Sequence, residues 1–267
     1  MQTGDSYDHP RYYEIAFSFR DIPREVDVME ECARRWSGLT GRRVLELACG
    51  PCPHMVELSR RGWHYTGIDI NNNMLEHGRA KARAAGVQAD LINASMTAFS
   101  LEVKVDLAFT ALGSLYVTST AEMNRHFISV ANALNTGGLY LLDWCVNFDL
   151  TRVYADSGET WDSSQDGIEV KTTVKMQPLD FVQQLFEENL IMEVDDHGTH
   201  AVISSRHPKR LIFPQEFLSF INMGHDFELV GWWNNWDLTK PLDSVCTEIS
   251  RPIILLRKKS EGLPPRY

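Results

Sequence analysis

Short apolar runs alternate with helix-forming stretches over the first half of the chain. Apolar runs of strand length occur at residues 44–48, 64–69, 88–93, 105–110 and 139–144. The segments 53–61, 72–85 and 120–134 have helical periodicity, and Ser119 and Glu122 have the spacing of a capping box before the last of them. Parallel strands need long crossover connections, which are usually helices. This order therefore predicts a doubly wound α/β fold with helices on both faces of a mostly parallel sheet.

A different pattern begins after residue 150. Residues 151–167 are mainly polar, and residues 168–176 then alternate apolar with polar side chains, which is the period of a half-exposed antiparallel strand. The alternation returns at residues 190–194 and 201–205, with turn residues at 195–198 between them. This block is therefore expected to be a small antiparallel β insertion over one end of the main sheet.

The rest of the chain is expected to complete the main fold. A helix is predicted at residues 214–223 and strands at 227–232 and 252–257, which brings the sheet to seven strands. Residues 11–19 and 24–36 are predicted to form two helices before the first strand. The resulting division is an N-terminal helical lid at residues 1–40, a core at 41–150 and 207–267, and an antiparallel cap at 151–206.

Composition and charge narrow the class of protein. Of the 267 residues 43% are hydrophobic, an ordinary globular composition that excludes disorder as the main state, and the formal charge is −10. No basic run exceeds three residues, so no nucleic-acid partner is expected. No apolar stretch reaches the roughly 18 to 20 residues that span a membrane, and residues 1–10 are polar, so a cytoplasmic location away from membranes is expected. Five cysteines, an odd number, favour reduced thiols over a disulfide framework.

A candidate ligand site follows the first predicted strand. This strand leads into the sequence ELACGPC at residues 46–52, and Asp69 ends the second strand. In a doubly wound sheet these two places lie side by side where a nucleoside binds, and a carboxylate there accepts hydrogen bonds from ribose hydroxyls. Gly50 has no Cβ and therefore lets the backbone approach the ligand closely.

These motifs resemble those of class I S-adenosylmethionine-dependent methyltransferases of the small-molecule type. The sequence at 46–52 is similar to the nucleotide loop of that family, with Ala48 and Cys52 where glycines are common. The sequence GIDINNNML at 67–75 is similar to its second motif, and FTAL at 109–112 to the segment beneath the methionine part of the cofactor. The resemblance covers about residues 42–144. It implies a Rossmann-like fold in which the last strand returns antiparallel beside the fifth.

The resemblance also implies roles for individual residues. Asp69 would hold the ribose and Met74 would pack against the adenine, while Ser95 stands where the family often has an Asp. The implied cofactor is S-adenosylmethionine, with S-adenosylhomocysteine as product, and the implied reaction is methyl transfer to a small-molecule acceptor. The cofactor-binding residues that the resemblance implies are Glu46, Ala48, Gly50, Asp69, Ile70, Met74, Ser95, Met96, Thr110 and Leu112.

Other interpretations of the segment 46–52 stay open at this point. A dinucleotide dehydrogenase has the same fold but uses three glycines around a pyrophosphate, and here only Gly50 is present. Cys49 and Cys52 are spaced like the redox dithiol of thioredoxin-like proteins. With His54 they could also suggest zinc, but no second ligand pair has matching spacing, so no metal is expected.

The acceptor is expected to meet the N-terminal lid and the ends of the strands. Methyl transfer is an in-line displacement at a carbon activated by the sulfonium, so it needs positioning and exclusion of water, and no catalytic residue is assigned. Aromatic side chains exclude water, and an arginine can pair with a carboxylate. The substrate-binding candidates are Tyr12, Tyr13, Arg20, Tyr116 and Trp144. The alternatives are a nucleic-acid or protein methyltransferase, or a catalytically silent protein that binds the cofactor.

Overall fold

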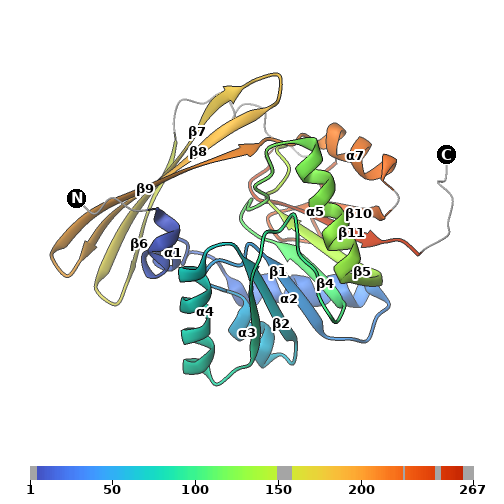
Figure 1. Ribbon diagram of the computed structural model, residues 1–267, viewed down its shortest axis with the longest axis horizontal. Coiled ribbons are helices and arrows are strands. Elements are labelled where there is room, and N and C mark those ends of the chain that lie inside the picture. Colours follow the sequence, from blue (N-terminus) through green and yellow to red (C-terminus); the bar gives the residue numbers. More distant parts are fainter. Residues whose placement is uncertain (1–4, 149–157, 225, 244–247, 261–267) are drawn as a thin grey trace.

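The computed structural model describes residues 5–148, 158–224, 226–243 and 248–260. It confirms the predicted α/β architecture, with a seven-stranded sheet beside a separate antiparallel sheet (Figure 1). Residues 151–157 of the predicted insertion, Cys246, and the terminal segments 1–4 and 261–267 lie outside the described residues.

The main sheet has the strand order β10-β11-β5-β4-β1-β2-β3. Strands β1 to β5 are all parallel to one another, β11 lies antiparallel beside β5, and β10 is antiparallel to β11. The return of the last strand beside the fifth is the arrangement that the resemblance implied. The strands are β1 (Arg43–Leu47), β2 (His64–Asp69), β3 (Ala89–Asn93), β4 (Val105–Thr110), β5 (Leu134–Asp143), β10 (Phe227–Asn234) and β11 (Pro252–Lys258).

Helices cover both faces of the main sheet (Figure 1). Side chains alternate between faces along each strand, so Leu45 and Leu47 share one core cluster and Val44 belongs to the other. Burial on both sides explains why these strands are continuous apolar runs in the sequence. The first cluster is closed by α5 (Thr120–Ala133) and α7 (Pro214–Met223), and the second by α2 (Ile22–Cys32), α3 (Met55–Arg60) and α4 (Asn72–Ala85).

Some element boundaries differ from the prediction for local reasons. β5 begins at Leu134, inside the stretch predicted to end the preceding helix, because Leu134 pairs with Val105 across an irregular step in register. α1 (Pro10–Ala16) ends before residue 19, and the predicted second helix continues past α2 only as a π-helical turn, Ala33–Ser37, which ends at Gly38 in the left-handed conformation.

The insertion is a four-stranded antiparallel sheet of order β6-β7-β8-β9. Its strands are β6 (Glu159–Gln165), β7 (Ile168–Asp180), β8 (Leu185–Asp196) and β9 (Thr199–Arg210). β7, β8 and β9 extend beyond the predicted alternating segments, and β6 lies in the stretch predicted only as polar. Most β6 side chains are exposed, so this edge strand has no apolar periodicity to reveal it.

Helix α1 joins the small sheet to the core. Ile15 and Ala16 pack against the buried face of the small sheet, and the indole nitrogen of Trp161 donates to the Ala16 carbonyl at 2.6 Å. On its other side, Glu14 pairs with His77 and Lys81 of α4. Figure 1 accordingly shows α1 between the small sheet and α4.

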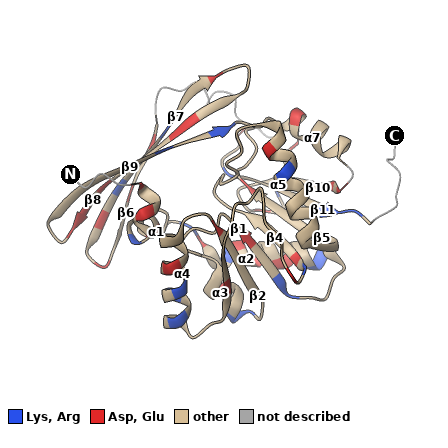
Figure 2. Ribbon diagram, in the orientation of Figure 1, with Lys and Arg blue, Asp and Glu red and all other residues tan. Residues whose placement is uncertain are grey.

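Charged residues are distributed over both parts of the molecule. Figure 2 shows Lys and Arg positions interspersed with Asp and Glu positions.

Within the described ranges no helix is both long and apolar enough to span a bilayer. The same ranges contain no group of three or more His, Cys, Asp or Glu side chains arranged to hold a metal ion.

Candidate functional site

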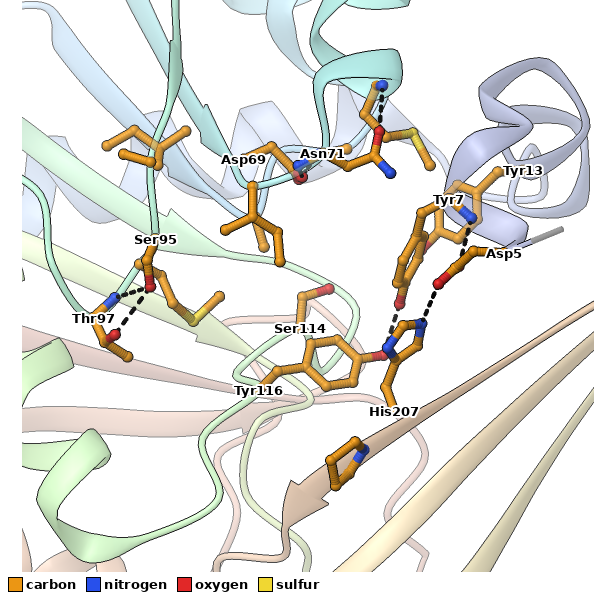
Figure 3. A pocket seen from close by; sticks show the side chains of 18 of the residues that line it. Asp5, Tyr7, Tyr13, Asp69, Asn71, Ser95, Thr97, Ser114, Tyr116 and His207 are labelled. Carbon is orange, nitrogen blue, oxygen red and sulfur yellow. Dashed lines mark hydrogen bonds and ion pairs between the residues drawn. The ribbon is translucent and has the colours of Figure 1, made fainter.

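A cavity of about 410 Å³ lies at the carboxyl ends of the parallel strands. Its volume is in the range of small-molecule sites, about 300–1,000 Å³. Ala48 and Gly50 of the loop after β1 line one wall, together with the end of β2 and the start of α4. Residues 94–97 after β3 form a second wall. The N-terminal segment and β9 close the side opposite the sheet, so that segments far apart in the sequence enclose one space (Figure 3).

Asp69 is fixed at the end of β2 by backbone donors. One of its carboxylate oxygens accepts the Gly50 N–H at 2.8 Å, and the other accepts the Asn71 N–H at 2.8 Å. Burial raises the pKa of Asp69, whereas these backbone hydrogen bonds act to lower it. Each oxygen keeps lone pairs for a ligand in the cavity, which suits a pair of vicinal hydroxyls.

The loop after β1 has an unusual backbone. Ala48, Gly50 and Cys52 all have positive φ, of 49°, 50° and 55°, a conformation that favours glycine. The Cys52 side chain fits because α4 has a glycine opposite it: a Cβ at Gly78 would lie 2.8 Å from the Cys52 sulfur. Burial raises the pKa of the Cys49 thiol, which keeps it protonated, and buried thiols of this kind are unreactive.

A buried ionic network lies behind this loop, outside the cavity. His54 is fully buried, with Nδ1 2.8 Å from the Glu46 carboxylate and Nε2 2.9 Å from Glu25 of α2. Glu46 also accepts the Tyr65 hydroxyl at 2.5 Å, and Glu25 pairs with Arg20. Burial and the neighbouring Arg20 act to lower the pKa of His54, but the two carboxylates outweigh them and raise the pKa. The raised pKa favours the protonated form of His54, which can donate to both carboxylates.

The network continues to the other end of the sheet. Arg251 donates to Glu25 at 2.7 Å and to Asp143 at 2.5 Å. Asp143, at the end of β5, also accepts the Leu112 N–H at 2.8 Å and the Trp236 indole N–H at 3.0 Å. The N-terminal helices, the helix that follows the loop after β1, and the C-terminal strands are thus held by one connected set of charges.

The side of the cavity away from the loop is aromatic. Tyr7 stacks on His207 with ring centroids 4.7 Å apart, and its hydroxyl lies 3.0 Å from that of Tyr116 (Figure 3). Tyr13 lies beside Tyr7 at 5.5 Å between centroids. The Nε2 atom of His207 is 3.5 Å from the Asp5 carboxylate. Burial raises the pKa of all three phenols, so each remains protonated.

The structure brings many of the predicted site residues together. Those on the wall of the cavity are Ala48, Gly50, Asp69, Ile70, Met74, Ser95, Met96, Tyr13 and Tyr116. Those that do not line it are Glu46, Thr110, Leu112, Tyr12, Arg20 and Trp144.

Each predicted residue away from the cavity has another partner. Tyr12 donates to Asp196 of β8 at 2.9 Å, Arg20 is buried against Glu25, and the Thr110 hydroxyl lies 2.8 Å from that of Tyr140. Trp144 lines a separate hollow with Ile249, Ser250 and Pro252. Glu46 points away because alternation along β1 places it, like Val44, on the face covered by α2, α3 and α4.

Several residues of the cavity were not predicted from the sequence. Asp5 and Tyr7 precede the helix predicted at residues 11–19, His207 lies in a strand with no motif around it, and Glu122 was noted only for its capping-box spacing. For Asp5 and Tyr7 the only local signal was the polar segment that precedes Pro10 of α1. His207 had none, because its place depends on how the small sheet folds over the core.

Sequence comparisons find similarity to methyltransferases over the first half of the chain. A family model for a methyltransferase domain matches residues 44–138. A putative methyltransferase of Geobacillus sp. (strain WCH70) is 27% identical over 117 residues, which are 43% of this chain and 47% of that protein. The chain thus matches about half the length of this curated relative.

Solved structures share the fold at low sequence identity. A S-adenosylmethionine-dependent methyltransferase from Clostridium acetobutylicum has a TM-score of 0.74 at 18% identity, and the match covers 93% of this chain and 96% of that one. An amino pentose methyltransferase from Micromonospora echinaspora, solved with S-adenosylmethionine bound, has a TM-score of 0.67 at 18% identity, with 92% and 96% covered.

Proposed function

We propose that the chain, whose residues 44–138 match a methyltransferase domain and whose fold is shared with solved methyltransferases, transfers the methyl group of S-adenosylmethionine to a small-molecule acceptor. The observation that carries the proposal is the shared cavity. One wall has the backbone loop and the carboxylate that suit a nucleoside, and the opposite wall is built from phenols and an imidazole.

The residues of the first wall fit this cofactor. Asp69 would accept hydrogen bonds from the two ribose hydroxyls, and Met74 and Met96 would pack against the adenine. Asp5, Asp69 and Glu122 line the cavity, and no Lys or Arg is among its described lining residues, which suits a sulfonium cation better than a pyrophosphate. S-adenosylmethionine supplies an electrophilic methyl carbon, so the protein needs mainly to position and desolvate the acceptor, with a base to take up the proton where the acceptor atom is protonated.

The second wall would hold the acceptor and exclude water from it. Tyr7, Tyr13 and Tyr116 come from the N-terminal segment and the loop after β4, and His207 comes from β9. A wall made from a lid and an inserted sheet favours a small molecule over an extended polymer. The structural neighbour that acts on an amino pentose supports the same acceptor class.

Calorimetric titration with S-adenosylmethionine and S-adenosylhomocysteine tests the cofactor assignment. Replacement of Asp69 by Ala removes two hydrogen bonds to a charged group, each about 1.5–3 kcal/mol, so we expect affinity to fall roughly 100-fold or more. Asp90→Ala is the matched control, since the Asp90 side chain is exposed on β3. Unchanged affinity in Asp69→Ala would contradict the assignment.

A second experiment measures the transfer of labelled methyl groups to a metabolite mixture. It separates an enzyme from a protein that only binds the cofactor.

A further inference from the structure

A chain of hydrogen bonds leads from the cavity into the small sheet. The Tyr7 hydroxyl lies 3.0 Å from the Tyr116 hydroxyl, and Tyr116 donates to the Glu188 carboxylate of β8 at 2.5 Å. The other Glu188 oxygen accepts from the Lys209 ammonium of β9 at 2.7 Å. Tyr7 and Tyr116 line the cavity, whereas Glu188 and Lys209 lie behind them.

The charges of Glu188 and Lys209 fix which group donates and which accepts in each of these hydrogen bonds. Burial alone would raise the pKa of Glu188, but Lys209 and the Tyr116 hydroxyl outweigh it and hold the pKa below its ordinary value, so Glu188 is ionised and only accepts. A phenol has one hydrogen. Tyr116 gives its hydrogen to Glu188 and must therefore accept from Tyr7. Tyr7 in turn has no hydrogen left, and its oxygen presents only lone pairs to the cavity.

We propose that the Glu188–Lys209 pair acts through Tyr116 to make Tyr7 a hydrogen-bond acceptor, which selects an acceptor molecule carrying an N–H or O–H group beside Tyr7. The proposal rests on the proposed methyltransferase function. A carboxylate or carbonyl oxygen at this place would face the Tyr7 lone pairs without a shared hydrogen, and a buried polar contact of that kind is costly. The cavity carboxylates, with no Lys or Arg beside them among the described lining residues, favour an ammonium group over a hydroxyl.

Glu188 and Lys209 are positioning residues in this scheme, since they touch neither cavity nor ligand. The substitution Glu188→Gln tests that role because it reverses the donor-to-acceptor direction of the hydrogen bonds between Tyr7 and residue 188. Its amide oxygen would accept from Lys209, and its amide nitrogen would then donate to Tyr116. Tyr116 would donate to Tyr7, and Tyr7 would direct its hydrogen into the cavity. Loss of packing alone would not produce this reversal of preference.

The experiment uses the full chain saturated with S-adenosylhomocysteine and three probes with the same ring: cyclohexylamine, cyclohexanol and cyclohexanecarboxylate. Calorimetry at neutral pH should show cyclohexylamine binding tightest, cyclohexanol next, and cyclohexanecarboxylate at least roughly ten-fold weaker than cyclohexylamine, which corresponds to about 1.4 kcal/mol. In Glu188→Gln the amine-to-carboxylate affinity ratio should fall at least roughly ten-fold. In Tyr7→Phe the difference between cyclohexanol and the carboxylate should shrink.

Glu187→Gln is the matched control, because Glu187 is the neighbouring residue of β8 and contacts Arg206 at 3.8 Å. It should leave the probe affinities and their ratio unchanged. Equal binding of amine and carboxylate by the original protein, binding of none of the probes, or an unchanged ratio in Glu188→Gln would overturn the inference. Failure of S-adenosylhomocysteine to bind would instead overturn the proposed function, and thermal melting of each variant verifies that it is folded.

Discussion

Replacement of His54 by Ala tests whether the buried charge network holds the N-terminal helices to β1 and the loop that follows it. His54 is fully buried and bridges Glu46 at the end of β1 and Glu25 of α2. Its ring also packs edge-to-face against Phe109, with centroids 4.8 Å apart. The substitution removes the imidazole between two buried carboxylates and leaves both of them in place.

The magnitude follows from the partners that remain. Each lost hydrogen bond joins charged groups and contributes about 1.5–3 kcal/mol. Glu25 keeps Arg20 and Arg251, so part of its loss is compensated, whereas Glu46 keeps only the Tyr65 hydroxyl among its described partners. Breaking a buried ion pair by removing one partner typically costs about 3–5 kcal/mol, and we expect the free energy of unfolding to fall by that amount.

The pH dependence has a definite sign. The pKa of His54 is raised in the folded state, so its stabilising contribution is fully present below the unfolded pKa of about 6.5 and is lost as pH rises through the folded pKa. The difference between the original protein and His54→Ala should therefore be largest near pH 6 and should shrink at alkaline pH.

Urea unfolding followed by tryptophan fluorescence at pH 6 and pH 9 measures both quantities. His64→Ala is the control, because His64 is half-exposed and its nitrogen lies 3.8 Å from Asp90. We expect this control to change stability by less than about 0.5 kcal/mol. A loss below about 1 kcal/mol for His54→Ala, or a larger loss at pH 9 than at pH 6, would refute the reasoning.

Two further substitutions test the packing and the buried polar groups. Gly78→Ala should destabilise the protein by about 1–2 kcal/mol in denaturant unfolding, because its Cβ would lie 2.8 Å from the Cys52 sulfur. The same change in a Cys52→Gly background should cost much less, and additive effects would contradict the contact. Burial lowers the pKa of His126 to about 4, so the unfolded state binds more protons between about pH 4 and 6.5 and stability falls with acid across that window. His126→Phe should flatten this slope, and an unchanged acid profile would contradict it.

Local patterns in the sequence predicted most of the fold. The alternation of apolar runs and helices over residues 43–144 located five parallel strands, because burial on both faces leaves a continuous apolar signature. Strand β6 escaped prediction since an edge strand with exposed side chains has no such signature. The proximity of Gly50 and Asp69 in the cavity was predictable for a similar reason: both lie in short motifs at strand ends, and strand ends of a doubly wound sheet meet at one edge.

The sequence by itself therefore determined the order of elements, the class of fold and the loop-and-carboxylate side of the cavity, all of which depend on neighbours within about 30 residues. Only the tertiary structure decided what faces that side. The rings of Tyr7 and His207 are stacked with centroids 4.7 Å apart although 200 positions separate them in the sequence. Glu46 forms hydrogen bonds with His54 and Tyr65 and does not line the cavity. The first contact arises from the packing of the N-terminal segment and the small sheet over the core, and the second from the way the helices pack on the sheet, and no periodicity along the chain records either of them.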